Sequence, residues 1–182
     1  FLFFAIYFYV LFRYKVASQG AATRTETARP LWLLPAIMVL WVNLHGGYVS
    51  GLLLIALFFI GELLNSITGR PSAKPASFLL VGIACAVAAL VNPNTYEALL
   101  YPFTYFGTSN ASMRFIVEWQ SPNFHEYIFI PFALGIIALV VIGAPGRIDF
   151  TSSLIIAAFS LMALQSVRHI ILFSIVAAPI LG

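Results

Sequence analysis

The sequence predicts an all-α protein, a polytopic transmembrane helical bundle with about 6–7 spans or part-spans. Of its 182 residues, 62% are hydrophobic and 8% are charged, and the mean hydropathy is +0.99. Soluble domains carry roughly 25% charged residues, so this composition argues against a water-soluble fold. Runs such as LLLIALFFI do not alternate in polarity as the strands of a membrane barrel do. Helices also pair their backbone groups internally, as the lipid core requires.

Both ends of the chain resemble interior parts of a longer protein. Residues 1–12 read as the second half of a span, without the basic flank or the small-residue cleavage site of a signal peptide. The last apolar segment, residues 170–182, is short for a span. We therefore expect a single transmembrane domain, residues 1–182, that is an interior fragment of a longer chain.

Apolar segments follow one another along the chain with polar interruptions between them. A polar stretch, residues 13–30, follows the first span. The next apolar stretch is interrupted at Asn43–Gly47, which predicts either a turn between two helices or a break within one span. After the first span, the apolar segments that we expect to be helical are residues 31–42, 48–64, 76–91, 127–142, 151–167 and 170–182.

The distribution of Lys and Arg predicts how these spans are oriented, because short cytoplasmic loops collect positive charge. If Asn43–Gly47 is a turn, the loops at 13–30, 70–75 and 144–149 share one side, which we expect to be the cytoplasm. This arrangement places seven of the nine positive residues inside, namely Arg13, Lys15, Arg24, Arg29, Arg70, Lys74 and Arg147. A single broken span would place only six there.

The same orientation gathers most other titratable groups at the extracytoplasmic surface. The longest interruption between apolar spans, residues 92–126, becomes an extracytoplasmic loop that contains an interfacial amphipathic helix kinked at Pro102. All three histidines, His45, His125 and His169, fall on this side. Ionisable groups near membrane depth are costly and often mark function. We therefore place the candidate site at this surface.

Two groups of candidate residues each allow a structural and a functional interpretation. Asn43 and His45 either cap helix ends or face a ligand. The side chains of Glu118, Trp119 and Gln120 suit a sugar ring, because an indole stacks on its apolar face while a carboxylate and an amide bond its hydroxyls. The alternative for this group is an interfacial Trp anchor with exposed neighbours.

Three further residues are candidates for holding a phosphate. Arg168 and Arg114 carry guanidinium groups, which bind phosphate oxygens bidentately, and His169 could act as a proton donor or acceptor beside them. For Arg168 the alternative is snorkelling to lipid headgroups. The spacing of His and acidic residues predicts no metal site, and we expect no cofactor and no nucleic-acid partner. A single cysteine, Cys85, allows no disulfide within the chain.

An ordered set of motifs resembles a group of bacterial multi-span membrane proteins. The motifs are WVNLHGG at 41–47, Asn92-Pro93, EWQSP at 118–122, and Arg168 with Pro179. These proteins are similar to the GT-C glycosyltransferases, which use polyprenyl-phosphate sugars. The resemblance implies a multi-pass protein of the bacterial plasma membrane that transfers a sugar from a lipid-phosphate donor at the extracytoplasmic face. That family's catalytic acid is an Asp or Glu in the first outer loop, which this sequence lacks, so the catalytic residue is unknown.

Three functional hypotheses follow. The first is a GT-C-type transferase with membrane lipids and a polyprenyl-phosphate sugar as its partners. The second is a non-catalytic integral subunit or scaffold of a larger membrane complex, respiratory or photosynthetic, whose small-residue helix faces pack on partner membrane subunits. The third is a transporter, for which the interrupted spans would supply half-helix sites, although the sequence shows no internal repeat.

Overall fold

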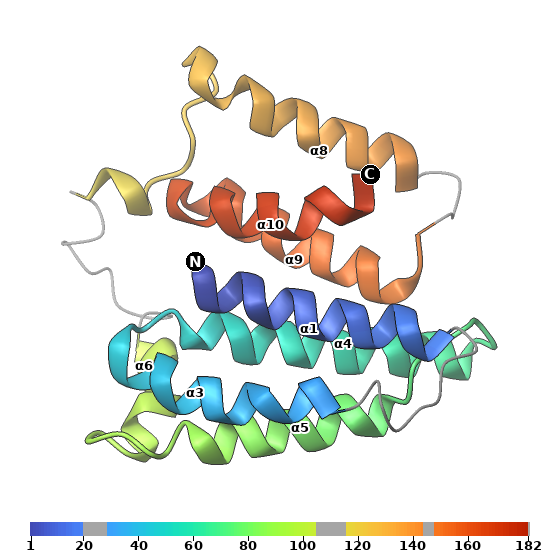
Figure 1. Ribbon diagram of the computed structural model, residues 1–182. Helices are drawn as coiled ribbons and strands as arrows, with labels where there is room; N and C mark the ends of the chain where they lie inside the picture. The colour runs from blue at the N-terminus through green and yellow to red at the C-terminus, as the bar shows by residue number, and fades with distance from the viewer. Residues whose placement is uncertain (20–28, 105–115, 144–147, 182) are drawn as a thin grey trace. The chain divides into compact units, whose positions relative to one another are not determined.

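The computed structural model describes residues 1–19, 29–104, 116–143 and 148–181, and all regular elements among them are helical (Figure 1). The all-α prediction is therefore confirmed for these residues. The chain divides into two compact units, Phe1–Thr108 and Ser109–Gly182. The division falls inside the segment that the sequence analysis assigned to a long loop, residues 92–126.

The described part of the first unit consists of four packed helices and a short fifth one. Helices α1, α3, α4 and α5 alternate in direction, and each packs against at least one other (Figure 1). Their bounds are α1 Leu2–Gln19, α3 Leu33–Leu44, α4 Tyr48–Ile67, α5 Pro75–Ala88 and α6 Tyr96–Thr104, with a 3₁₀ turn η1 at Arg29–Trp32. Helix α6 contains Pro102 and coincides with part of the predicted interfacial helix.

Helix α1 is longer than the sequence analysis predicted. It extends to Gln19, so Arg13 and Lys15 belong to the helix and not to a polar loop that begins at residue 13. Its buried residues recur every three or four positions, from Phe4 and Tyr7 to Tyr14 and Lys15, as expected for one face of a helix. The assignment of Lys15 to a loop was therefore wrong, because its side chain lies on the buried face.

The segment around Asn43–Gly47 is a turn between two helices. Helix α3 ends at Leu44, α4 begins at Tyr48, and the two run in opposite directions (Figure 1). The hairpin interpretation is confirmed, and the alternative of one broken span is not. Gly51 permits the close contact of this hairpin, because a Cβ there would lie 2.6 Å from the Trp41 ring.

Contacts at the two ends of the first unit agree with the predicted grouping of its connections. At one end the Gln19 side chain donates a hydrogen bond to the Pro71 carbonyl, 3.3 Å away. At the other end the Asn43 amide donates to the Val91 carbonyl at 2.8 Å. The segments after α1 and before α5 thus share one end, while the α3–α4 turn and the end of α5 share the other.

Aromatic side chains fill the core of this unit. The Phe58 and Phe78 rings stack with centroids 5.4 Å apart, and Tyr7 meets Trp41 edge to face at 5.2 Å. The Tyr7 hydroxyl lies in this apolar core, and it donates a 2.6 Å hydrogen bond to the Leu34 carbonyl. A buried hydroxyl without such a partner would be costly.

The described residues of the second unit form three longer helices, and two of them form a tight hairpin. Helices α9 and α10 pack along each other, and α8 packs on α10 (Figure 1). Their bounds are α8 Ile130–Gly143, α9 Phe150–Gln165 and α10 Ile170–Leu181, with 3₁₀ turns η2 Val117–Trp119, η3 Tyr127–Phe129 and η4 Val167–His169. Asp149 caps α9 by accepting a hydrogen bond from the Ser152 amide at 3.1 Å.

One helix of the described residues has the length and polarity of a full membrane span. Helix α4 has 20 residues and a mean hydropathy of 1.9. The other apolar helices are shorter, and the 14 residues of α5 cover about 21 Å at about 1.5 Å per residue. The helical architecture of the predicted bundle is thus confirmed, and among the described helices only α4 reaches a full span.

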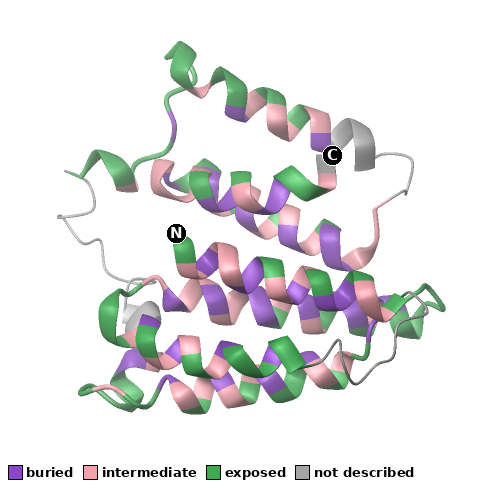
Figure 2. Ribbon diagram, in the orientation of Figure 1, coloured by how far each residue is buried: buried purple, intermediate pink, exposed green. Residues whose placement is uncertain are grey.

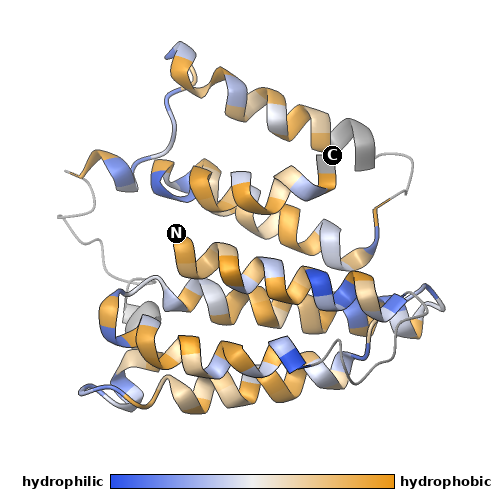
Figure 3. Ribbon diagram, viewed as in Figure 1, coloured by the Kyte–Doolittle hydropathy of each residue, from blue (hydrophilic) through white to orange (hydrophobic). Residues whose placement is uncertain are grey.

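Large apolar side chains lie on the outer faces of both units as well as in their cores. Buried and exposed residues alternate around the helices (Figure 2). Hydrophobic residues, in contrast, occupy most of the length of the helices (Figure 3). Residues of this kind, each more than half exposed, include Leu2, Leu40, Leu80, Ile137 and Leu161. A water-facing helix would carry polar residues at such positions.

Candidate functional site

The candidate site is the junction site, formed by residues 118–121 and 165–169 of the second unit. Helix α9 ends at Gln165, Ser166 is extended (φ −152°, ψ 124°), and η4 then leads directly into α10. The other segment consists of the last two residues of η2 and the extended Gln120 (φ −81°, ψ 156°), followed by Ser121. Two irregular connections, both predicted at the sequence level as interruptions, therefore lie side by side.

Three hydrogen bonds join the two segments of the junction site. The Ser166 hydroxyl donates to the Glu118 carbonyl at 2.7 Å, and the Val167 amide donates to the Gln120 carbonyl at 3.0 Å. The Ser121 hydroxyl donates to the Gln165 carbonyl at 3.4 Å. Because these residues are more than 40 positions apart in the chain, the pairing is a tertiary contact that local sequence does not reveal.

The Trp119 ring is the centre of the junction site. The Arg168 guanidinium carbon lies 5.1 Å from its centroid, which is a cation–π contact. The His169 imidazole meets the same indole edge to face, with centroids 6.4 Å apart. The guanidinium and the imidazole that the sequence predicts as ligand-binding groups thus both contact the predicted indole.

Burial makes the His169 imidazole favour its neutral form. It belongs to η4, the connection between α9 and α10, and its Nδ1 is buried without a hydrogen-bond partner among the described residues. Desolvation by burial lowers the pKa of this group below 6.5, the backbone of Met162 opposes the shift, and the charge of Arg168 adds to it. A neutral imidazole at pH 7 can exchange a proton with a bound group.

The polar side chains of Glu118 in η2 and of Gln120, which follows η2, face outward. Glu118 and Gln120 are exposed, whereas Trp119, Arg168 and His169 are half-buried. The junction site therefore presents a carboxylate and an amide at its rim and a guanidinium stacked on an indole behind them. This combination can bond hydroxyl groups and an anionic oxygen at neighbouring positions.

Two other predicted site residues lie in the first unit, and a third is not described by the structure. Asn43 and His45 belong to the first unit, where the Asn43 amide donates to two carbonyls and the His45 Nδ1 accepts the Gly47 amide at 2.8 Å. These contacts match the structural interpretation, in which both residues organise a helix end. Their predicted contact with a ligand stays a prediction. Arg114 lies outside the described residues.

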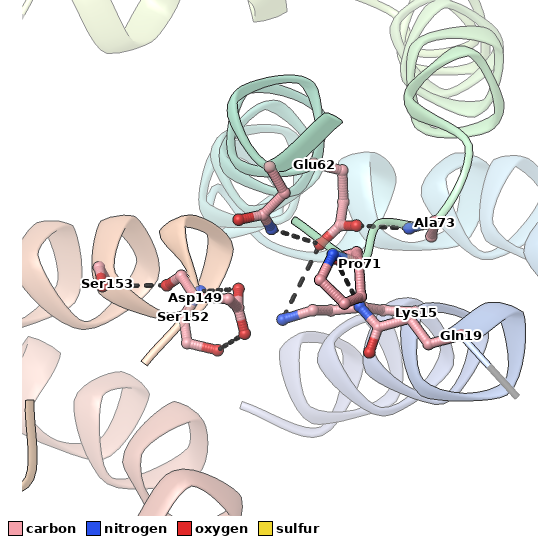
Figure 4. A network of polar contacts seen from close by, with 9 residues as sticks. Lys15, Gln19, Glu62, Pro71, Ala73, Asp149, Ser152 and Ser153 are labelled. Carbon is pink, nitrogen blue, oxygen red and sulfur yellow. Dashed lines mark hydrogen bonds and ion pairs between the residues drawn. The ribbon is translucent and has the colours of Figure 1, made fainter. Parts of the chain in front are cut away.

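Sequence reasoning missed a buried polar network in the first unit. The Lys15 ammonium lies 3.8 Å from a Glu62 oxygen, with 5% and 0% of the two side chains exposed. The other Glu62 oxygen accepts the Ala73 amide at 2.6 Å, and Asn65 donates to Glu62 at 3.4 Å (Figure 4). The available signal was that Lys15, Glu62 and Asn65 lie on helix faces whose other buried residues are largely apolar.

Ser166 was also absent from the predicted site, although it makes the shortest of the three bonds across the junction site. A serine next to two apolar segments carries no signal in sequence. Among the described residues no three His, Cys, Asp or Glu side chains are grouped so that they could hold a metal ion. Comparison of the chain with protein-family models, with curated proteins and with solved structures finds no match.

Proposed function

We propose that this chain is part of an integral membrane protein that binds a lipid-linked phosphate sugar at the junction site, as a GT-C-type glycosyltransferase does. The observation that carries the proposal is the Trp119–Arg168–His169 cluster beside exposed Glu118 and Gln120. The resemblance of the WVNLHGG and EWQSP motifs to such proteins points in the same direction.

Two features support a location in a membrane, and the resemblance of the motifs points to the bacterial plasma membrane. Helix α4 has the length and hydropathy of a span, and apolar side chains cover outer helix faces in both units. Burying such faces in lipid removes apolar surface from water, at roughly 25 cal/mol per Å². The shorter helices would cross with help from flanking 3₁₀ turns or from local thinning of the bilayer.

The chemistry of the junction site supports an amphiphilic phosphate as ligand. Arg168 is held against an indole face, so its planar group loses less freedom when it bonds phosphate oxygens. Glu118 and Gln120, the exposed neighbours of Trp119, offer an acceptor and an amide for sugar hydroxyls. The catalytic Asp or Glu that the resembling family carries in its first outer loop would come from another part of the protein.

The test is binding of polyprenyl phosphate to the full-length protein in lipid nanodiscs. Arg168→Gln should weaken binding by at least about tenfold, because a charge-assisted hydrogen bond contributes roughly 1.5–3 kcal/mol. The affinity of Arg168→Lys should lie between those of the wild type and of Arg168→Gln, since an ammonium keeps the charge but loses the bidentate geometry. Arg70→Gln, an exposed arginine of the first unit, is the matched control and should bind like the wild type.

Three results would count against the proposal. Equal polyprenyl phosphate affinity of Arg168→Gln and the wild type would remove Arg168 from the site. If Arg168→Gln lost as much affinity for phosphatidic acid as for polyprenyl phosphate, the lipid-headgroup anchor would be favoured over a polyprenyl site. If the wild type itself binds no polyprenyl phosphate, the non-catalytic subunit becomes the better hypothesis.

A further inference from the structure

Ser166 lies at a position where a serine side chain normally caps the helix that follows it. It directly precedes η4, and an N-cap serine there would accept a hydrogen bond from an amide of the following turn. Its side chain makes no such cap bond. The hydroxyl instead donates to the Glu118 carbonyl at 2.7 Å, across 48 residues of sequence.

The partner carbonyl belongs to the residue before Trp119. Ser166 is 4% exposed, so water does not compete effectively for this bond. The neighbouring bond from the Val167 amide to Gln120 holds the residue after Trp119. The backbone is thus held on both sides of the indole by the two residues that precede Arg168.

We propose that Ser166 is a positioning residue that sets the Trp119 ring against Arg168 and His169. With the Glu118 carbonyl bound, the backbone that carries the indole is fixed to the segment that carries the guanidinium and the imidazole. Loss of the hydroxyl leaves the bonds from Val167 to Gln120 and from Ser121 to Gln165, which both hold the chain after Trp119, so residues 118 and 119 can shift. The consequence for ligand binding rests on the proposed function, whereas the placement of the ring does not.

The experiment uses the full-length protein labelled with 5-fluorotryptophan, whose fluorine resonances report the surroundings of each indole. The chain described here contains three tryptophans, and the resonance of Trp119 is identified by its absence in Trp119→Phe. Ser166→Ala should shift or broaden the Trp119 resonance and leave those of Trp32 and Trp41, in the first unit, unchanged. It should also weaken polyprenyl phosphate binding by about tenfold, the effect of losing roughly one buried hydrogen bond.

Matched variants keep the result interpretable. Ser174→Ala removes a hydroxyl that donates to the Ile170 carbonyl within α10, and it should leave the Trp119 resonance in place. Ser166→Cys places a larger thiol, which is a weak donor, at the same position and replaces Ser166→Ala if that variant does not fold. An unchanged Trp119 resonance in the Ser166 variants overturns the inference. A shifted resonance supports it even if the wild type binds no polyprenyl phosphate, a result that would overturn the proposed function alone.

Discussion

At the scale of single residues, the contacts of Arg168 show how an exposed region can hold a cation in one place. A surface arginine ordinarily samples many rotamers, and fixing it costs side-chain entropy. Here the guanidinium lies on the Trp119 ring, 5.1 Å from its centroid, in a junction joined by three hydrogen bonds. Much of the entropic cost of ordering Arg168 is therefore met by folding and not by a ligand.

We predict that the protein loses stability as the pH is lowered through the titration range of His169. Burial lowers the pKa of this imidazole below 6.5 in the folded state, so the unfolded chain binds the proton more tightly. The free energy of unfolding should then fall as the pH drops from about 6.5 through the folded-state pKa. Thermal unfolding in nanodiscs at about pH 7.5 and about pH 5 measures the effect.

Two histidine variants isolate this contribution. His169→Gln should remove part of the pH dependence, whereas His125→Gln, at an exposed position, should retain it. The prediction is wrong if the unfolding temperature of His169→Gln decreases as much on acidification as that of the wild type.

At the scale of elements, the apolar segments of the sequence located most of the helices. The prediction of a helix over 151–167 corresponds to α9, and that over 170–182 to α10. The main error was at α1, where charged residues suggested a loop that begins at residue 13. Polarity alone could not show that Lys15 has a buried carboxylate partner on another helix, because the residues are 47 positions apart.

We predict that Glu62→Gln destabilises the first unit. The Glu62 carboxylate faces Lys15 and accepts the Ala73 amide, so it links α1, α4 and the segment before α5 (Figure 4). Removing one charge of a buried pair typically costs about 3–5 kcal/mol. Unfolding in detergent, followed by Trp41 fluorescence, measures the change.

The matched control is Glu97→Gln at an exposed position, which should change stability by no more than about 0.5 kcal/mol. The double variant Lys15→Met with Glu62→Gln should be less destabilised than the sum of its single variants, since each change removes the same pair. Additive effects would show that Lys15 and Glu62 are not coupled.

At the scale of the whole molecule, the unequal distribution of Lys and Arg among the loops predicts a membrane topology. The fold of the first unit is compatible with this topology. The segments after α1 and before α5 share one end of that unit, and the α3–α4 turn lies at the other. The orientation relative to a membrane, and the side on which the second unit presents the junction site, remain part of the proposal.

We predict that cysteines at positions 45 and 125 react with a membrane-impermeant maleimide added outside intact cells. Cysteines at positions 70 and 74 should react only after permeabilisation, because basic loops stay in the cytoplasm. All four positions are exposed in the structure, so differences in labelling report the side of the membrane. Labelling of His45→Cys and Lys74→Cys from the same side would contradict the proposed topology.

The sequence by itself determined the all-α class, an interruption at Asn43–Gly47 and the residue types of the candidate site. These follow from hydrophobic periodicity, glycine and proline signals and side-chain chemistry, which are local properties. Tertiary structure alone decided that Glu118–Gln120 and Ser166–His169 meet, and that Lys15 lies opposite Glu62. Such contacts depend on how helices pack, and the free energy of packing is shared among residues distant in the chain, so no single segment encodes it.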